Sequence, residues 1–512
     1  APVRWRGLPR DIWGRWKRGG RRRSLRLCAG AGLTPGHAQP AAKVPTLILI
    51  SPTLDRVTGV LLVVLTGVVI AQEWHLLGPA PALLAPLVLA LTALLTLQVA
   101  PGRRAFVAVA GVLTLALVWR DPEGWRAVVA RAVASAAFIV AFFSALASLR
   151  SAAQQAAAIR AGGTFLALQP PGRRYLALTL GGQAFALLLN YGAIALLGSL
   201  ATAAARDEPD AEIRAHRTRR MLLAIQRGFV ASLPWSPMSF AVAISTALIP
   251  GTSWGTMLLP GLATMVLLTG VGWGLDTLFK PKLSRPPAPR IPPEGSWALL
   301  LPLALLLGLL VLSVLALQLA TGFRVTGIVM LVVPLMALGW VALQQREGCP
   351  SLPRRVREFV CADLPSFRGE ITLLMMAGYI GTVGAPLLAP LIQSSPFHPE
   401  DLPTPLVLAG LVWLVPLCGQ IGMNPILTVS LIAPSVPSAE MLGVPPVAIV
   451  TAITAGWALG GISSPFTATT LLVGNFGGVS ARHVGLRWNG SYMAVMLVLL
   501  PLWVLLLAWL AG

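Results

Sequence analysis

Residues 297–319, WALLLPLALLLGLLVLSVLALQL, form a run of 23 residues without a charged side chain. A second run, 76–100, covers 25 residues without a charge. A helix of either length crosses the hydrocarbon core of a bilayer, which is about 30 Å thick, because each helical residue adds about 1.5 Å. A signal peptide would give one short run near the start, whereas such runs recur along this chain. The pattern predicts several membrane-spanning helices.

The composition points to the same class of protein. Of the 512 residues, 56% are hydrophobic and only 11% are charged, whereas soluble domains carry about 25% charged residues. So few charges cannot cover a water-exposed surface of this size. The chain is therefore predicted to be an all-α membrane protein in contact with the lipid bilayer, with about 10–12 membrane-embedded elements.

Apolar stretches separated by polar segments give the expected order of these elements. We expect them near 48–72, 76–100, 105–119, 132–149, 175–200, 228–275, 297–319, 324–343, 371–393, 404–421, 424–436, 445–474 and 490–511. The charged segments 202–227 and 346–370 are expected to be loops.

The formal net charge of +21 is concentrated at the start of the chain, where residues 1–50 hold eleven Lys or Arg and one acid. Such a run can bind nucleic acid. Directly before a first span, however, basic residues stay in the cytoplasm and fix the orientation of the helices. We therefore expect residues 1–46 to be a poorly ordered, cytoplasmic arm without a nucleic-acid partner.

A proline-rich segment divides the chain. Lys280–Glu294 contains six prolines in fifteen residues, which excludes a helix and favours a stiff, extended linker. The expected domains are a first membrane repeat, 47–279, the linker, 280–296, and a second membrane repeat, 297–512.

A short internal repeat supports this division. Arg227–Ser239, RGFVASLPWSPMS, aligns with Ala455–Thr467, AGWALGGISSPFT, at an offset of 228 residues. The alignment pairs Gly228 with Gly456, Ser236-Pro237 with Ser464-Pro465, and Ser239 with Thr467.

A second match lies upstream in each half. Gly182-Gln183 precedes Asn190, and Gly419-Gln420 precedes Asn424. The interval from Asn190 to Ser236 is 46 residues, and that from Asn424 to Ser464 is 40. The same features recur in the same order, which predicts a structural duplication.

Proline and glycine at these positions predict broken helices inside the membrane. Proline removes a backbone donor, and lipid cannot satisfy the groups that a break exposes, so the break must face protein or a water-filled cavity. The N-terminus of a half-helix attracts an anion, while unwound carbonyls suit a cation such as Na⁺. The alternative is an ordinary proline kink whose Ser and Thr side chains bond their own backbone.

The predicted solute site combines the hydroxyl, amide and backbone groups of both halves. Its residues are Asn190, Gly192, Ser236, Pro237, Ser239, Asn424, Pro425, Ser463, Ser464, Pro465 and Thr467. A Na⁺ ion is a further candidate near Asn190, Asn424 and the adjacent carbonyls.

The motifs of ATP-driven pumps and of zinc proteases are missing. The sequence contains no Walker A motif and no His-Glu-x-x-His, and its four cysteines match no metal or disulfide spacing. We therefore expect neither an enzyme nor a cofactor, apart from Na⁺ or H⁺ as a coupling ion.

Gly422–Pro434, GMNPILTVSLIAP, followed by Ala455–Gly474, AGWALGGISSPFTATTLLVG, resembles the ion transporter superfamily. That group includes divalent-anion:sodium symporters, citrate transporters, arsenite exporters, sodium/proton antiporters and the large membrane subunits of tripartite periplasmic transporters. The resemblance implies two inverted-topology repeats with re-entrant hairpins and broken helices, an elevator-like motion, and often a homodimer. It would place the hairpins in or near 132–149 and 371–393.

The resemblance is incomplete at the tips that face the substrate. Divalent-anion symporters carry Ser-Asn-Thr there, whereas this chain has Ser236-Pro-Met-Ser239 and Ser464-Pro-Phe-Thr467. Carboxylate specificity and sodium coupling are therefore not carried over, and no subfamily is assigned.

The function predicted from these features is secondary active transport of a small anionic solute, coupled to Na⁺ or H⁺, in a bacterial inner membrane. One alternative is a cation/proton antiporter or metalloid exporter. Another is a membrane-embedded transferase or polymerase. A periplasmic binding protein would be a partner if the chain belonged to a tripartite system.

Overall fold

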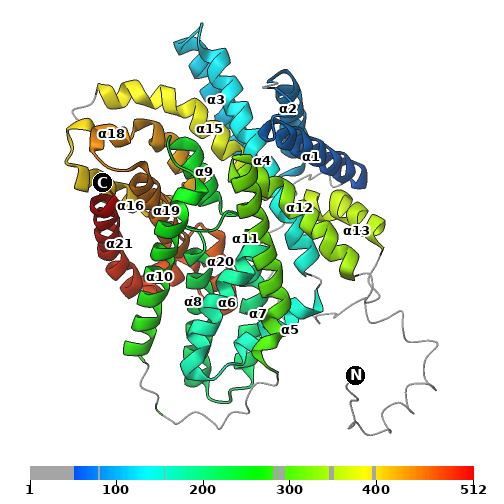
Figure 1. Cartoon of the computed structure of the whole chain (residues 1–512), viewed down its shortest axis with the longest axis vertical. Helices are drawn as coiled ribbons and strands as arrows, with labels where there is room; N and C mark the ends of the chain where they lie inside the picture. The colour runs from blue at the N-terminus through cyan, green and yellow to red at the C-terminus, as the bar shows by residue number, and fades with distance from the viewer. Residues whose placement is uncertain are drawn as a thin grey trace. The chain divides into compact units, whose positions relative to one another are not determined.

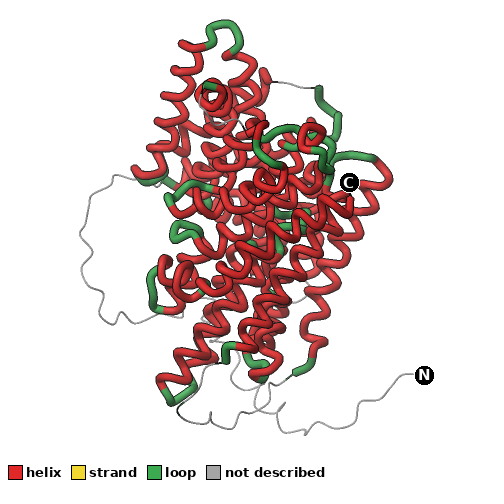
Figure 2. The backbone as a smooth tube through the Cα atoms, turned by 90° about the vertical axis from the view of Figure 1, so that its left-hand side faces the viewer, coloured by secondary structure: helices red, strands yellow, loops and turns green. Residues whose placement is uncertain are grey.

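A computed structural model of the chain describes residues 51–78, 81–154, 156–280, 284, 295–344, 351–394 and 399–511. The predicted N-terminal arm and most of the predicted proline-rich linker lie outside the described residues. The described residues belong to one unit of the fold. The described part is helical and contains no strand (Figure 2).

Ten α-helices occur in the described residues of the first half. They are α1 (Pro52–Glu73), α2 (Pro81–Gln98), α3 (Pro101–Arg120), α4 (Trp125–Gln154), α5 (Ala157–Ala167), α6 (Pro171–Leu189), α7 (Tyr191–Arg206), α8 (Ala211–Ala231), α9 (Phe240–Leu248) and α10 (Trp254–Leu278), all labelled in Figure 1.

In the second half, the part of the chain that the structure describes contains eleven α-helices and several short 3₁₀ or π segments. The helices are α11 (Leu301–Thr321), α12 (Val325–Gln344), α13 (Leu352–Glu358), α14 (Leu364–Ser366), α15 (Arg368–Gln393), α16 (Thr404–Gln420), α17 (Pro425–Ile432), α18 (Ala439–Leu442), α19 (Pro446–Ser463), α20 (Ala468–Gly477) and α21 (Gly490–Ala511). Two of these segments are π-helical, η4 (Phe359–Asp363) and η7 (His483–Trp488).

The prediction of an all-α membrane protein is confirmed. Within the described residues, nine helical segments are long and apolar enough to cross a membrane, and four shorter helices are also apolar. On α11, large apolar side chains such as Leu305, Leu309 and Leu312 are more than half exposed. A water-soluble surface seldom carries such a stripe, whereas lipid solvates it well.

The prediction that hairpins lie in or near 132–149 and 371–393 is wrong. Both stretches belong to single continuous helices, α4 and α15. Their apolar length alone suits either a span or a hairpin, and tertiary packing decides between the two. The α4 helix packs along α15, and it also packs against α1 and α12.

Two predicted loops are also partly helical. Residues 202–227 contain the start of α8, whose N-terminus is capped by Asp210, since its carboxylate accepts hydrogen bonds from the backbone N–H groups of Glu212 and Ile213. Residues 346–370 contain α13, η4 and α14. High charge suggested a loop in both places, but Arg and Glu are good helix formers.

Candidate functional site

The first half folds back on itself at Asn190, between α6 and α7. Asn190 has φ 50° and ψ −131°, a conformation that ends α6. Gly163 on α5 lies against the side chains of both Phe185, in α6, and Leu197, in α7. Along one continuous helix those two residues would be about 18 Å apart. The helices α6 and α7 therefore form a hairpin, called hairpin 1, with Asn190 at its tip and the buried Gly192 just beyond it.

The second half folds back between α16 and α17. Leu411, in α16, and Ile432, in α17, line the same small cavity, whereas on a continuous helix they would be about 32 Å apart. The turn contains Gly422 at φ 88°. It ends at Asn424, whose Oδ1 accepts a 2.8 Å hydrogen bond from the N–H of Ile426, and Pro425 occupies the first helical position of α17. This pair is called hairpin 2.

A break of the same local form interrupts α8–α9 and α19–α20. In break 1, residues 232–239, Ser236 donates its N–H to the carbonyl of Ser232, and its Oγ accepts a 3.1 Å bond from the N–H of Met238. In break 2, residues 464–467, Ser464 donates its N–H to the carbonyl of Gly460, and its Oγ accepts a 3.2 Å bond from the N–H of Phe466.

The end of each break repeats as well. Ser239 donates its N–H to the carbonyl of Ser236, and Thr467 donates its N–H to the carbonyl of Ser464. The residue pairs aligned in the sequence thus occupy equivalent positions, with Pro237 and Pro465 inside the two turns. Ser236 and Ser464 are only 2% and 1% exposed.

Each hairpin tip contacts the broken helix of its own half. The hydroxyl of Ser464 donates a 2.6 Å bond to the carbonyl of Gly419, and the side chain of Gln420 donates to the Oγ of Ser463 at 3.3 Å. In the first half, the ring of Tyr191 stacks on that of Phe229 with a centroid distance of 5.1 Å.

The aligned glycines have one shared role. A β-carbon added at Gly228, on α8, would collide with the carbonyl oxygen of Thr179 on α6. A β-carbon at Gly456, on α19, would lie 2.7 Å from the carbonyl oxygen of Val412 on α16. Each glycine therefore lets the first arm of a hairpin approach the backbone of the first half-helix of its own half.

The second arms pack within their own halves, α7 against α8 and α17 against α15, and also across the two halves. The second arm of hairpin 1, α7, packs against α20, with Gly198 next to the ring of Phe476. The second arm of hairpin 2, α17, packs against α9. The half-helices meet as well, since Gly461 on α19 lies against Val230 and Leu233 at the end of α8.

Three threonine hydroxyls gather where α20 begins. The Oγ1 of Thr467 lies 3.0 Å from that of Thr469 and 3.1 Å from that of Thr470. Thr470 also donates to the carbonyl of Ser464 at 2.6 Å, and Thr469 donates to the carbonyl of Gly461. Much of this hydroxyl cluster is therefore engaged in satisfying the carbonyls that break 2 exposes.

The structure brings the predicted site residues together in two groups. One comprises hairpin tip 2 and break 2, with Asn424, Pro425, Ser463, Ser464, Pro465 and Thr467. The other comprises hairpin tip 1 and break 1, with Asn190, Gly192, Ser236, Pro237 and Ser239. Solute and Na⁺ binding by these residues stays a prediction. No group of three or more His, Cys, Asp or Glu in the described ranges could hold a metal ion.

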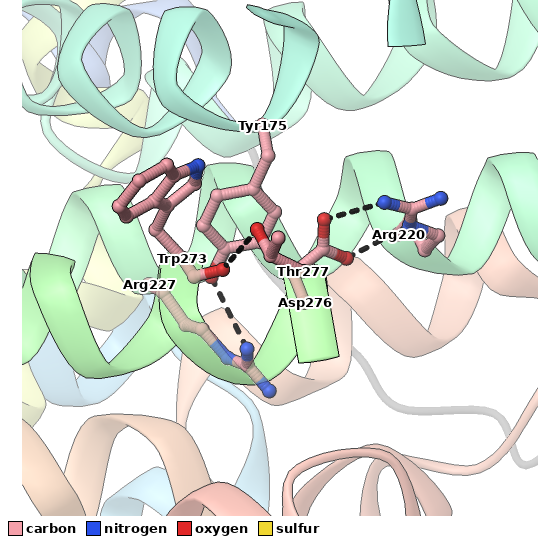
Figure 3. A network of polar contacts seen from close by, with 6 residues as sticks. All are labelled: Tyr175, Arg220, Arg227, Trp273, Asp276 and Thr277. Carbon is pink, nitrogen blue, oxygen red and sulfur yellow. Dashed lines mark hydrogen bonds and ion pairs between the residues drawn. The ribbon is translucent and has the colours of Figure 1, made fainter. Parts of the chain in front are cut away.

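A buried polar network beside break 1 was not predicted (Figure 3). Arg227 on α8 is only 5% exposed; its Nη1 donates to the hydroxyl of Tyr175 at 3.1 Å and its Nε donates to the Oδ1 of Asn489 at 3.1 Å. Its guanidinium also lies over the ring of Tyr492, 4.4 Å from the centroid.

The same network joins the halves directly. The Nδ2 of Asn489, which precedes α21, donates to the Oε1 of Gln226 at 3.0 Å. Room for the network comes from Gly272 on α10, which lies against the hydroxyl of Tyr175. Nearer the start of α8, Arg220 forms a two-pronged ion pair with Asp276 on α10 (Figure 3). Sequence spacing could not reveal the contacts of Asn489 with Gln226 and Arg227, which lie more than 250 positions away.

A polar cavity of about 140 Å³ adjoins break 1. Pro237 of the break lines it, together with Thr246 on α9 and Ser253 in the α9–α10 turn. The opposite wall is formed by Gln318 and Arg324 at the α11–α12 turn. Water or a small polar solute can therefore reach the neighbourhood of the break.

Gly251-Thr-Ser-Trp-Gly255 matches the Gly-x-Ser-x-Gly spacing of a hydrolase nucleophile. Its serine has a different role here. Ser253 caps α10 in a reciprocal arrangement with Thr256. A nucleophile elbow needs a preceding strand, and none exists in the part of the chain that the structure describes.

Comparison with known proteins identifies two transporters of similar fold. The YdaH transporter of Alcanivorax borkumensis matches with a TM-score of 0.53 at 18% identity, over 79% of this chain and 98% of that one. MtrF of Neisseria gonorrhoeae, described as illuminating a class of antimetabolite efflux pumps, matches with a TM-score of 0.52 at 13% identity, over 81% and 96%. No family model matches the sequence, and neither does any curated protein. At these identities the likeness establishes a shared fold.

Proposed function

We propose that the protein is a secondary active transporter that moves a small anionic solute, coupled to Na⁺ or H⁺. The observation that carries the proposal is the repeated site architecture. Each half has a helix break with the same hydrogen-bond pattern around Ser236 or Ser464, and each break adjoins a hairpin tip of its own half. Paired breaks of this kind are the recurring plan of solute sites in secondary transporters.

Electrostatics favours an anion at these breaks. The half-helices α9 and α20 begin there, and helix N-termini carry partial positive charge and unpaired N–H groups. The buried cation Arg227 lies one turn before the end of α8. No acidic side chain occurs among the residues of either break.

The packing also supports two inverted-topology repeats that move relative to a scaffold. The helices α6, α7, α8 and α9 of the first half correspond to α16, α17, α19 and α20 of the second. Under this correspondence, the contact of α7 with α20 matches that of α17 with α9. The contact of α6 with α8 likewise matches that of α16 with α19. A two-fold relation of this type lets one half open while the other closes, which alternating access requires. The resemblance to elevator-type transporters is in keeping with this motion.

Export is the second candidate function, since one transporter of similar fold is described as an efflux pump. In that case the solute would be carried outward, against its gradient, by inward flow of the coupling ion.

The test is solute flux in proteoliposomes containing the purified full chain. Radiolabelled organic acids and inorganic oxyanions are presented under an imposed Na⁺ gradient, an imposed H⁺ gradient, or neither. We expect at least one solute to accumulate only under a gradient and to leave when an ionophore collapses that gradient. Reversing the gradient separates uptake from export.

A matched control keeps this test specific. Ser464→Ala alters break 2, whereas Ser313→Ala replaces a serine on α11, which lies in neither break nor hairpin. The proposal predicts reduced flux for the first variant and unchanged flux for the second. Flux that ignores both ion gradients for every anion would refute the coupled mechanism.

A further inference from the structure

An apolar cavity of about 300 Å³ lies between α1, α4 and α12, far in sequence from both hairpin tips. Its walls include Ala145 on α4 and Pro334 and Ala337 on α12. The segment α13–η4 closes one end with Leu352, Arg355 and Phe359, among other side chains. Almost all of its lining is apolar, so a hydrated ion or a small polar solute would find few partners there.

The cavity opens toward the lipid-facing surface. Val63 and Gly67 on α1 both line it and both are exposed, and Leu338 on α12 is 41% exposed. A β-carbon added at Gly67 would have no neighbour within 4 Å, so the space beside it is empty of protein atoms. Because α1 and α12 are both long and apolar enough to span a membrane, the occupant available at this opening is a lipid chain.

The helix α13, which lines the cavity through Leu352, Arg355 and Val356, is basic. The seven-residue helix α13 carries Arg354, Arg355 and Arg357 against a single acid, Glu358. Arg354 and Arg355 both donate to Glu358 at 3.0 Å. The bond from Arg354 lowers the pKa of Glu358, and the bond from Arg355 adds to this effect. With Glu358 ionised, α13 keeps a net charge of about +2. Arg354 and Arg357 are exposed, so this charge faces outward.

We infer that this cavity binds one acyl chain of an anionic phospholipid whose headgroup lies against Arg354 and Arg357. The apolar walls take the chain, and the basic helix selects for negative charge. The site is independent of the solute site, and it would stand if the transport proposal failed.

The experiment is native mass spectrometry of the full chain, purified in mild detergent and supplied with equal amounts of phosphatidylglycerol and phosphatidylcholine of identical chains. The wild-type protein should retain phosphatidylglycerol in preference to phosphatidylcholine. Gly67→Leu fills the empty space, so it should reduce retention of both lipids about tenfold, the loss expected when two methylene groups no longer fit.

Two controls make the result specific. Gly308→Leu changes a glycine on α11 whose β-carbon would also meet nothing within 4 Å, but which does not line the cavity, and it should leave retention unchanged. Arg354→Gln combined with Arg357→Gln should abolish the preference for phosphatidylglycerol while phosphatidylcholine binding persists.

A second pair of variants guards against misfolding of Gly67→Leu. Val63 and Val64 are adjacent and similarly exposed, at 42% and 46%, but only Val63 lines the cavity. Val63→Trp should therefore reduce lipid retention, and Val64→Trp should not. Equal retention by these two variants, or equal retention of the two lipids by the wild-type protein, would overturn the inference.

Discussion

The two breaks share a backbone pattern but differ in how they are held. Break 2 is short and is tied to its hairpin by the hydroxyl of Ser464, which donates to the carbonyl of Gly419 at 2.6 Å. Break 1 is twice as long, and the carbonyl of Trp235 accepts a 2.9 Å bond from the indole N–H of Trp254 on α10. The hairpin residue Tyr191 stacks on Phe229 of α8, just before the break. The halves thus repeat a local turn, whereas their tertiary supports have diverged.

The starts of the two following half-helices differ in the same way. Ser239 caps α9, because its Oγ accepts a 3.1 Å bond from the N–H of Ala241. Thr467 makes no such cap on α20, and its hydroxyl instead donates to the carbonyl of Ser464 at 3.0 Å. The first turn of α20 therefore has more N–H groups available for an anion than that of α9. Break 2 should contribute more to anion binding, and break 1 more to the rigid connection between halves.

The largest expected effect concerns the aligned glycines in the helices that precede the two breaks, Gly228 and Gly456. Gly228→Ala and Gly456→Ala should each destabilise the protein by about 2–3 kcal/mol, because the added methyl group meets a backbone carbonyl that cannot rotate away. The measurement is the unfolding temperature of each purified variant in detergent. If one variant is as stable as wild type, the two glycines are not equivalent.

Gly270→Ala, on α10, provides the control for this comparison. A β-carbon there meets nothing within 4 Å, so the higher helix propensity of alanine should leave stability unchanged or slightly raised. A large loss in this control would mean that any helix glycine gives the same result.

The next largest effect concerns the polar network around Arg227, a residue that aligns with Ala455 in the second half. Arg227→Met removes two hydrogen bonds and a cation–π contact, which should cost about 2 kcal/mol in a membrane-embedded network. Tyr175→Phe removes one of those bonds and should cost less. Arg206→Met, at an exposed position in α7, serves as the control for loss of charge. Equal unfolding temperatures for Arg227→Met and Arg206→Met would contradict a structural role of the network.

The smallest effect distinguishes the two aligned serines. Ser464→Ala removes a hydrogen bond to the hairpin and one within the break, which should lower the free energy of unfolding by about 1 kcal/mol. Ser236→Ala removes only the hydrogen bond within the break, so its loss of stability should be about half as large. Differential scanning fluorimetry of both variants side by side measures this. The reverse order would mean that break 1, and not break 2, depends more on its serine.

Sequence reasoning located the broken segments but not the surrounding hairpins. The Ser-Pro pairs and the aligned Gly228 and Gly456 are local signals, because proline and glycine restrict or free the backbone wherever they occur. The continuity of α4 and α15 is set by their packing against each other, which no local pattern encodes. The sequence singled out Asn190 as a candidate solute ligand, which stays a prediction, whereas its place at a hairpin tip follows from the contacts of α6 and α7 with α5 and α8.

Charged segments were the other difficulty. The start of α8 was expected to be a loop, because its Arg residues and neighbouring acids resemble a solvated connection. Its helix is capped by Asp210 and anchored by the pair between Arg220 and Asp276. Arg227 lies at the end of that charged segment, and its partner Asn489 is 262 residues away. Only the tertiary fold could reveal that it is buried.

The central claim is that both hairpin tips and both breaks form one solute site. The most direct measurement is the KM of Asn190→Ala and of Asn424→Ala for the solute that the proteoliposome assay identifies. Loss of one hydrogen bond to the solute should raise KM about tenfold in each variant, while Asn475→Ala, in the last turns of α20, should leave it unchanged. An unchanged KM in both tip variants, with flux intact, would contradict the claim.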